Sequence, residues 1–512
     1  MHTAACRIVI TQRHLPENDM SGKMDRRDFI KVSGLGAAAA ATVGASGCVP
    51  DATPAPGSTD AWWTTQAFEL EEATIAGLTD DMATGRRSSV DITQLYLDRI
   101  AALDRDGPQL RSIIETNPEA LTLAAELDEE RAAGNVRGPL HGIPIVVKDN
   151  VDTADGMMTT AGSYALEGHI ASQDSHVAVQ LKAAGAIILA KANLSEWANF
   201  RSTRSSSGWS GRGGQCGNAY AVDRNPCGSS AGSGAATSAN FCAGSIGTET
   251  NGSIVCPSSV NGVVGLKPTV GLVSRSGIIP IAHTQDTAGP MTRTVADAAA
   301  MLTALAGADP RDPMSAPAAQ YTDTDYRDFL DASALRGARI GVERSYFGAD
   351  PHRDDLMEQA IVDMANAGAT IIDNADLVNR SRIGAPSYQV LLYEFKTDLE
   401  LYFQSVAPEL NMRTLDDLIA FNEANADREM PWFGQEIVIE AAAKGDLSTP
   451  EYLESKETAR RYSQDEGIDW LMEEHQLDAI VAPTTRSAWK TDLINGGISS
   501  LGSSSNAAVA GY

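Results

Sequence analysis

The chain has 512 residues, of which 43% are hydrophobic, and its formal net charge at pH 7 is −27. This length and composition are sufficient for a large buried core. Because nucleic-acid binding needs a basic surface, the charge argues against a nucleic-acid partner and is typical of an acidic, well-solvated protein.

Residues 1–47 are predicted to be an export signal. Arg26 and Arg27 precede an apolar stretch rich in Gly and Ala over 32–45, a pattern typical of twin-arginine signals. The stretch is shorter than the roughly 20 apolar residues that a membrane-spanning helix needs. The alternative is a buried or amphipathic helix, which the glycines disfavour. We therefore expect an exported protein, either periplasmic or anchored to a membrane.

Cys48 is a candidate for lipid attachment. It ends the run Ala-Ser-Gly-Cys, which is similar to a lipoprotein cleavage box, although such boxes usually have leucine where Ala45 stands. Lipid on Cys48 would anchor the chain to a membrane. Residues 48–66, which are rich in Pro, Gly, Ser and Thr, are then predicted to be a flexible tether. The folded domain is expected over 67–512.

Three helices are predicted in the first part of this domain. One covers 69–83, the second follows Ser88 and Ser89, either of which can cap it, and the third covers 119–133. We expect these helices to form a layer on the main body of the domain.

The elements that follow predict an α/β fold. A β-branched run over 143–147 indicates a buried strand, a helix is expected over 174–185, and 186–190 indicates the next strand. This alternation predicts a single large domain. Its central twisted sheet should be mixed but mostly parallel, with helices on both faces.

Later segments continue the α/β pattern. We expect strands over 338–342, 369–372 and 478–483, a helix over 356–368, and mainly helices over 388–475. The last residues, 502–512, show neither a strand nor a helix pattern. The domain is therefore expected to be truncated at its C-terminal end.

The six cysteines do not indicate a metal site, because none shows a C-x-x-C spacing. Four of them fall within 216–256. They could be free buried thiols or, in an oxidising compartment, could form a disulfide. Free thiols are the favoured interpretation, since the sequence cannot fix a pairing.

Lys148, Ser229 and Ser253 are the candidate catalytic residues. Lys148 ends an apolar run, and each serine lies in a glycine-rich segment, over 228–234 and 247–254. A serine nucleophile needs a base, and lysine can serve if burial lowers its pKa from about 10.4 to near neutrality. Taken singly, such features are typical of a linker, a surface lysine and a turn. Their combination in this order indicates a serine hydrolase that needs no cofactor and no metal.

A histidine triad is the alternative mechanism. His141 is the best-placed histidine, just before the predicted strand, but a triad would also need a serine and an acid beside it. Backbone amides over Thr250, Asn251, Gly252 and Ser253 could converge on a developing oxyanion, which glycine in this segment would allow.

These segments, together with 138–144, 262–269 and 289–294, resemble the amidase signature family. The resemblance covers about 68–512 and is most specific in 138–297. It implies that Ser253 is the nucleophile and that Ser229, on a cis peptide bond after Gly228, bridges Ser253 to the neutral base Lys148. It also implies further elements beyond the end of this chain, without which the central sheet would lack support.

Within the family, segments 193–201, 207–210 and 393–396 are similar to bacterial peptide amidases. Those enzymes remove the C-terminal amide of peptides and release ammonia. The similarity implies a peptide or small-molecule amide substrate, and tethered export favours a monomer. The residues expected to bind the substrate are Asn199, Phe200, Arg201, Trp209 and Tyr393.

Two residues depart from the family pattern. Asn251 and Cys227 both stand where glycine is common.

Two other functions remain open. One is an amidotransferase-type glutaminase subunit. That role would need partner subunits and cytosolic tRNA, so the predicted export signal argues against it. The other is a non-catalytic, truncated envelope lipoprotein.

Overall fold

The computed structural model describes residues 67–498 and 500–512. The predicted export signal, the tether over 48–66 and the lipid site at Cys48 lie outside the described residues. Within them, no helix combines the length and the apolar character needed to cross a membrane.

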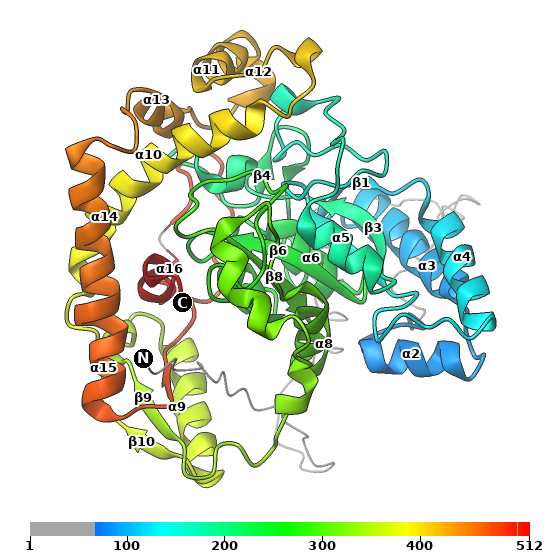
Figure 1. Cartoon of the computed structure of the whole chain (residues 1–512), viewed down its shortest axis with the longest axis horizontal. Coiled ribbons are helices and arrows are strands. Elements are labelled where there is room, and N and C mark those ends of the chain that lie inside the picture. The colour runs from blue at the N-terminus through cyan, green and yellow to red at the C-terminus, as the bar shows by residue number, and fades with distance from the viewer. Residues whose placement is uncertain (1–66, 499) are drawn as a thin grey trace, which may run out of the picture.

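The first helices form a layer beside the sheet, in blue and cyan in Figure 1, as predicted. They are α2 (Ile75–Ala83), α3 (Ser89–Ile100) and α4 (Ala120–Ala132). Ser88 caps α3 and exchanges hydrogen bonds with Asp91, which satisfies two free amides at the helix start. The prediction that the first helix begins at 69 is wrong, because Thr74 caps α2 five residues later.

A six-stranded mixed sheet lies at the centre, in the order β1-β3-β2-β6-β8-β7. Its strands are β1 (Ile113–Thr116), β2 (Pro144–Lys148), β3 (Ile187–Ala192), β6 (Gly244–Glu249), β7 (Val264–Gly265) and β8 (Thr287–Thr292). The pairs β2–β3 and β2–β6 are parallel, whereas the pairs toward both edges are antiparallel. The sheet is mixed as predicted, but its parallel part is confined to the three middle strands.

Helices flank this sheet and bury it. They include α5 (His176–Ala183), α6 (Ala231–Ser238), α7 (Val255–Val260) and α8 (Val295–Leu305). Every residue of α6 is buried. Its side chains are all small, so the helix packs closely against β2 and β6, where the candidate catalytic residues lie.

A second, three-stranded parallel sheet stands apart from the first. It consists of β9 (Arg339–Val342), β10 (Thr370–Ile372) and β11 (Ala479–Val481) in the order β10-β9-β11. The helices α9 (Pro351–Asn366) and α15 (Asp469–His475) accompany it at the lower left of Figure 1. The three strands were predicted, but not that they form a sheet of their own. A two-stranded ribbon, β4 (Trp209–Ser210) with β5 (Gly214–Gln215), is also separate.

The region over 388–475 is mainly helical, as predicted. Its helices are α10 (Gly384–Phe403), α11 (Leu415–Ala424), α12 (Ala426–Glu429), α13 (Glu436–Ala442) and α14 (Pro450–Ser463). The prediction that 502–512 contains no helix is wrong, since α16 (Ser505–Ala510) forms there. Ala508 and Ala510 of this short helix are buried, and it packs on α14, so tertiary contacts rather than a long apolar pattern stabilise it.

Candidate active site

Lys148 lies at the carboxyl end of β2, and its side chain is completely buried. Its Nζ donates to Ser229 Oγ at 2.7 Å, to Thr248 Oγ1 at 2.8 Å and to the Thr248 carbonyl at 3.2 Å. The three partners are uncharged. Burial lowers the pKa of Lys148 to about 7, although the charges of Asp286 and Glu249 act in the opposite direction. A neutral amine is therefore accessible at physiological pH.

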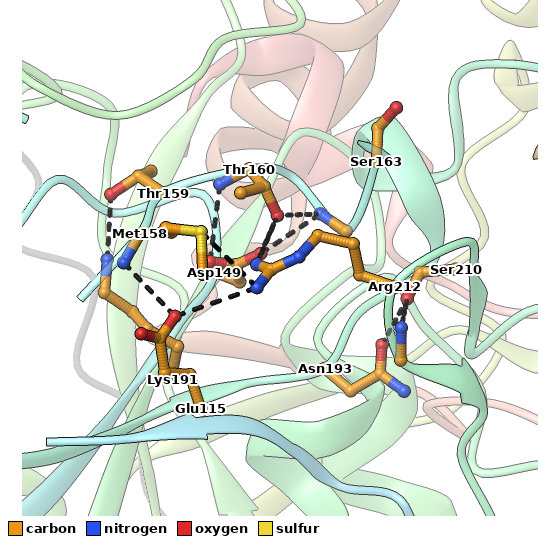
Figure 2. Close-up of polar contacts among 12 residues, drawn as sticks. Glu115, Asp149, Met158, Thr159, Thr160, Ser163, Lys191, Asn193, Ser210 and Arg212 are labelled. Carbon is orange, nitrogen blue, oxygen red and sulfur yellow. Dashed lines mark hydrogen bonds and ion pairs between the residues drawn. The ribbon is translucent and has the colours of Figure 1, made fainter. Parts of the chain in front are cut away.

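A buried polar network fixes the chain directly after Lys148 (Figure 2). The Asp149 carboxylate accepts from the Thr160 hydroxyl and the Gly162 amide, and burial raises its pKa. Figure 2 shows that the Arg212 guanidinium lies among Thr160, Asp149 and Glu115 and contacts all three. Since the Asp149 carbonyl also accepts from the amides of residues 160 and 161, the end of β2 is held from several directions.

Ser229 follows Gly228 through a cis peptide bond, as the family resemblance implied. Its carbonyl accepts from the Ser195 amide at 3.0 Å. A β-carbon at residue 228 would collide with the Ser195 hydroxyl, so only glycine fits there. The Ser230 amide donates to the Ser253 carbonyl at 3.1 Å, which joins the two serine segments directly.

Ser253 lies in a tight loop between β6 and α7 and is buried except for 8% of its surface. The buried Glu249 carboxylate organises this loop by accepting from the amides of Gly252, Ile254 and Val255 at 2.7, 2.7 and 3.0 Å. The Gly252 amide is thus occupied. No hydrogen bond within the described part of the chain takes up the amides of Thr250, Asn251 and Ser253.

Ser253 borders a pocket of about 410 Å³. The predicted substrate residues Asn199 and Phe200 line it, together with the loop over 250–253. Other lining residues come from distant parts of the chain and are mainly apolar or hydroxylic: Ile281, Leu391, Thr484, Trp489, Ile498, Ser500, Ser504 and Ser505. The Asn251 side chain accepts from the Ser504 hydroxyl at 2.8 Å, so the start of α16 lies against the Ser253 loop.

The structure places Arg201, Trp209 and Tyr393 outside the lining of this pocket, and their role in substrate binding stays a prediction. Arg201 is buried, bonds Glu196 at 2.6 Å, and lies against the Trp209 ring at 5.1 Å. Tyr393 is buried on α10 and donates to Glu451. In this structure their side chains pack between segments. On α10 it is Leu391 that reaches the pocket.

Cys227 and Cys256 form a disulfide, which corrects the expectation of free thiols at these two positions. Cys216 and Cys242 are free and buried, as expected. The pairing depends on the folding of the two serine segments against each other, and the sequence does not show this proximity.

Three residues of the site were not predicted. Thr248 and Glu249 lie inside the recognised segment over 247–254, and their polar side chains among glycines were an available signal. Asp286 accepts from the Thr250 hydroxyl at 2.5 Å and from the amides of Ile281 and Ala282. Burial raises the pKa of Asp286 to about 6. It belongs to no motif that we identified.

One group of side chains has the composition of a metal site. Ligand atoms of His283, Glu394 and Asp398 lie within 4.8 Å of one another. Both imidazole nitrogens already face carboxylates, with Nδ1 at 2.9 Å from Asp398 and Nε2 at 3.3 Å from Glu394. Burial alone would lower the pKa of His283, but these two carboxylates raise it. The arrangement is that of a carboxylate cluster around the His283 imidazole.

The family model described as Amidase matches residues 91–497, most of the chain. The chain belongs to the amidase family. The resemblance to the amidase signature family is thereby confirmed, and the protein is a hydrolase that acts on the C–N bond of amides.

Solved and curated amidases extend the comparison. The structure of the native peptide amidase from Stenotrophomonas maltophilia superimposes with a TM-score of 0.82 and 50% identity, over 87% of this chain and 90% of that one. A probable amidase of Arabidopsis thaliana is 40% identical over 425 residues, covering 81% of this chain and 80% of its own. The similarity to peptide amidases confirms the fold prediction.

An amidotransferase is a more limited match. A glutamyl-tRNA(Gln) amidotransferase subunit of Thermosynechococcus vestitus is 41% identical over 310 residues. This match covers 60% of this chain and 61% of the amidotransferase chain, a smaller share than the amidases cover.

Proposed function

We propose that this amidase hydrolyses the C-terminal amide of peptides and releases ammonia, with Ser253 as nucleophile, Ser229 as proton bridge and Lys148 as base. The 2.7 Å contact between Lys148 Nζ and Ser229 Oγ carries the proposal. A buried lysine with a pKa of about 7 beside a serine hydroxyl has the properties of a general base at neutral pH.

In the first step, Ser253 Oγ attacks the carbonyl carbon of the substrate amide. Its proton passes to Ser229, whose own proton passes to neutral Lys148. The free amides of Thr250, Asn251 and Ser253 are the candidate donors for the oxyanion, each worth about 3 kcal/mol in the transition state. Gly252 is left out of this set, because its amide donates to Glu249.

In the second step, the C–N bond breaks and ammonia leaves with a proton delivered from Ser229, which Lys148 replenishes. An acyl-enzyme remains on Ser253. Water then attacks this ester, and the same base removes the water proton. The products are the peptide carboxylic acid, ammonia and regenerated Ser253.

The substrate class follows from the pocket and the relative. The pocket of about 410 Å³ has room for the last residue of a peptide, and Phe200, Ile281 and Leu391 offer it an apolar wall. The solved relative that is 50% identical is a peptide amidase. Both observations favour peptide amides over very small amides.

The test is ammonia release by the full chain from a C-terminally amidated dipeptide, with propionamide and glutamine as alternative substrates. We expect release from the dipeptide, and a loss of at least about 10³-fold in Ser253→Ala and Lys148→Ala. Cys242→Ala is the matched control and should keep full activity. Hydrolysis of glutamine alone would favour the glutaminase alternative, and no hydrolysis by the folded chain would contradict the proposal.

We also propose that the protein is exported and works as a monomer in the periplasm or on a membrane, tethered through Cys48. The paired arginines before the apolar stretch over 32–45 support this location. The disulfide supports it independently, since disulfides persist in oxidising compartments.

A further inference from the structure

The disulfide joins the two chain segments that carry the candidate catalytic serines. Cys227 precedes Ser229 by two residues, and Cys256 follows Ser253 by three. Both half-cystines border the same pocket as Ser253, and they are almost fully buried against Trp489. The crosslink therefore connects the two segments that must stay aligned for proton transfer.

The backbone at Cys227 indicates that this position is specialised. Its φ is +56°, in the left-handed region, where glycine is free of strain and a residue with a β-carbon is not. The Cys227 amide donates to the Asn225 side chain at 2.8 Å, which helps to hold this conformation. A strained cysteine at a position suited to glycine points to a role for its sulfur.

The crosslink adds a covalent bond to the hydrogen bonds that join the two segments. The Ser230 amide donates to the Ser253 carbonyl at 3.1 Å, and the Ser230 hydroxyl donates to the Thr248 carbonyl at 3.0 Å. The sequence separation of the cysteines is 29, and the loop they close contains Ser229, α6, β6 and Ser253. The disulfide thus closes the catalytic segment into a ring and limits how far the two serines can separate.

We infer that the Cys227–Cys256 disulfide is a positioning crosslink, which keeps Ser229 aligned with Ser253 and makes turnover depend on the oxidised state. The inference rests on the proposed function of the two serines. A shift of about 1 Å between catalytic groups can cost roughly a hundredfold in rate, so a small relaxation is sufficient to reduce turnover.

Reduction supplies the test. Dithiothreitol gives two electrons and two protons: the Cys227–Cys256 bond breaks, two cysteine thiols form, and the reagent closes to its cyclic disulfide. With the folded full chain, we expect kcat for the amidated dipeptide to fall at least about tenfold while KM changes less than about threefold. Mass spectrometry after alkylation confirms which thiols have formed, and reoxidation should restore kcat.

A double variant covers the case in which reduction unfolds the chain. Cys227→Gly with Cys256→Ala removes the crosslink and the backbone strain together, and we expect the same fall in kcat, with no further effect of dithiothreitol. Cys242→Ala, which changes a buried free thiol, should respond to reduction as the wild type does.

Three outcomes are decisive. A folded reduced chain or folded double variant whose kcat stays within about twofold of the oxidised wild type would overturn the inference. Loss of the folded circular dichroism spectrum in both forms would also overturn it, since the disulfide would then serve global stability. An oxidised wild type without amidase activity would contradict the proposed function instead.

Discussion

Lys148 owes its lowered pKa to the uncharged groups that its amine contacts. Among the described residues the amine bonds Ser229 and Thr248 and no carboxylate, so the cost of burial exceeds the attraction of the more distant Asp286 and Glu249. A lysine in direct contact with an acid would remain protonated and could not accept a proton from serine.

The pH dependence of activity follows from this pKa. Lys148 must be neutral to act as a base, so kcat/KM should rise with pH, with a midpoint near the pKa of about 7. Below the midpoint the protonated amine blocks proton transfer, and rates should fall about tenfold per pH unit. Initial rates between pH 5 and 9 provide the measurement. A flat profile through neutrality would show that Lys148 is not the base.

Asp286 should tune that midpoint. Its charge raises the pKa of Lys148, so Asp286→Asn should lower the pKa and move the rise in kcat/KM to lower pH. The change also weakens the bond to Thr250, so kcat should decrease at all pH values. Asp174→Asn, which removes a carboxylate paired with Lys182, is the control and should leave the midpoint unchanged. A midpoint that does not move in Asp286→Asn would contradict this electrostatic account.

Individual residues of the site were predictable to different degrees. Lys148 and Ser229 were identified from their segments, and the structure brings them into contact. Asp286 was not, because its influence arises from proximity in space between segments 36 residues apart. The substrate-binding role of Arg201 stays a prediction, since a polar residue in a distinctive motif can serve a buried ion pair, as it does here with Glu196, as well as a ligand.

Among the elements, the loop between β6 and α7 depends on Glu249. One carboxylate accepts from three amides there, and this leaves other amides of the loop free for an oxyanion. Glu249→Gln puts an NH2 group where an acceptor is required, so the loop should open. We expect kcat to fall about a hundredfold, similar to the loss of an oxyanion donor, with a smaller change in KM.

The comparison that checks this prediction is Glu115→Gln. Glu115 is also acidic, belongs to the polar network of Figure 2, and lies on the edge strand β1 rather than in the loop between β6 and α7. Its replacement should affect kcat far less. Equal losses in both variants would mean that the Glu249 effect is not specific to the loop.

Arg201 ties the segment after β3 to α12. It bonds Glu196 at 2.6 Å and also the Glu429 carbonyl, and all three residues are buried. Arg201→Met would leave the buried carboxyl groups of Glu196 and Glu429, 2.6 and 3.8 Å from the guanidinium, without their cation, and we expect a loss of about 3–5 kcal/mol in the free energy of unfolding. Urea denaturation measures it. Arg428→Met removes an exposed ion pair with Glu167 and should cost far less than Arg201→Met.

The elements themselves were largely predictable, because their signals are local. The capped helix α3 and the apolar strands β2 and β3 lie close to their expected positions. The separate sheet of β9, β10 and β11 was not predicted, since the partner of a strand is a property of the folded chain. The helix α16 was missed for the same reason, because its stability comes from packing on α14.

At the scale of the whole molecule, the pocket is assembled from distant regions of the chain. The serine segments, Leu391 of α10, and the C-terminal residues Thr484, Trp489 and Ser504 all line it. Trp489 also packs on the disulfide, so the crosslink contacts both the serine segments and a C-terminal part of the pocket wall. A pocket of this kind forms only when the whole domain has folded.

The disulfide should also contribute to global stability. Closing a loop with a sequence separation of 29 restricts the unfolded chain, and the chain-entropy relation gives about 3–4 kcal/mol. The double variant Cys227→Gly with Cys256→Ala should lose about that amount in urea denaturation. An unchanged denaturation midpoint would contradict this contribution.

The central claim is that Ser253 carries the acyl group. Rapid-quench mass spectrometry of the full chain with an amidated dipeptide tests it most directly. We expect the mass of the dipeptide acyl group on the proteolytic fragment that contains Ser253, and its absence in Ser253→Ala. An acyl group on another residue, or amide hydrolysis that persists in Ser253→Ala, would contradict the account.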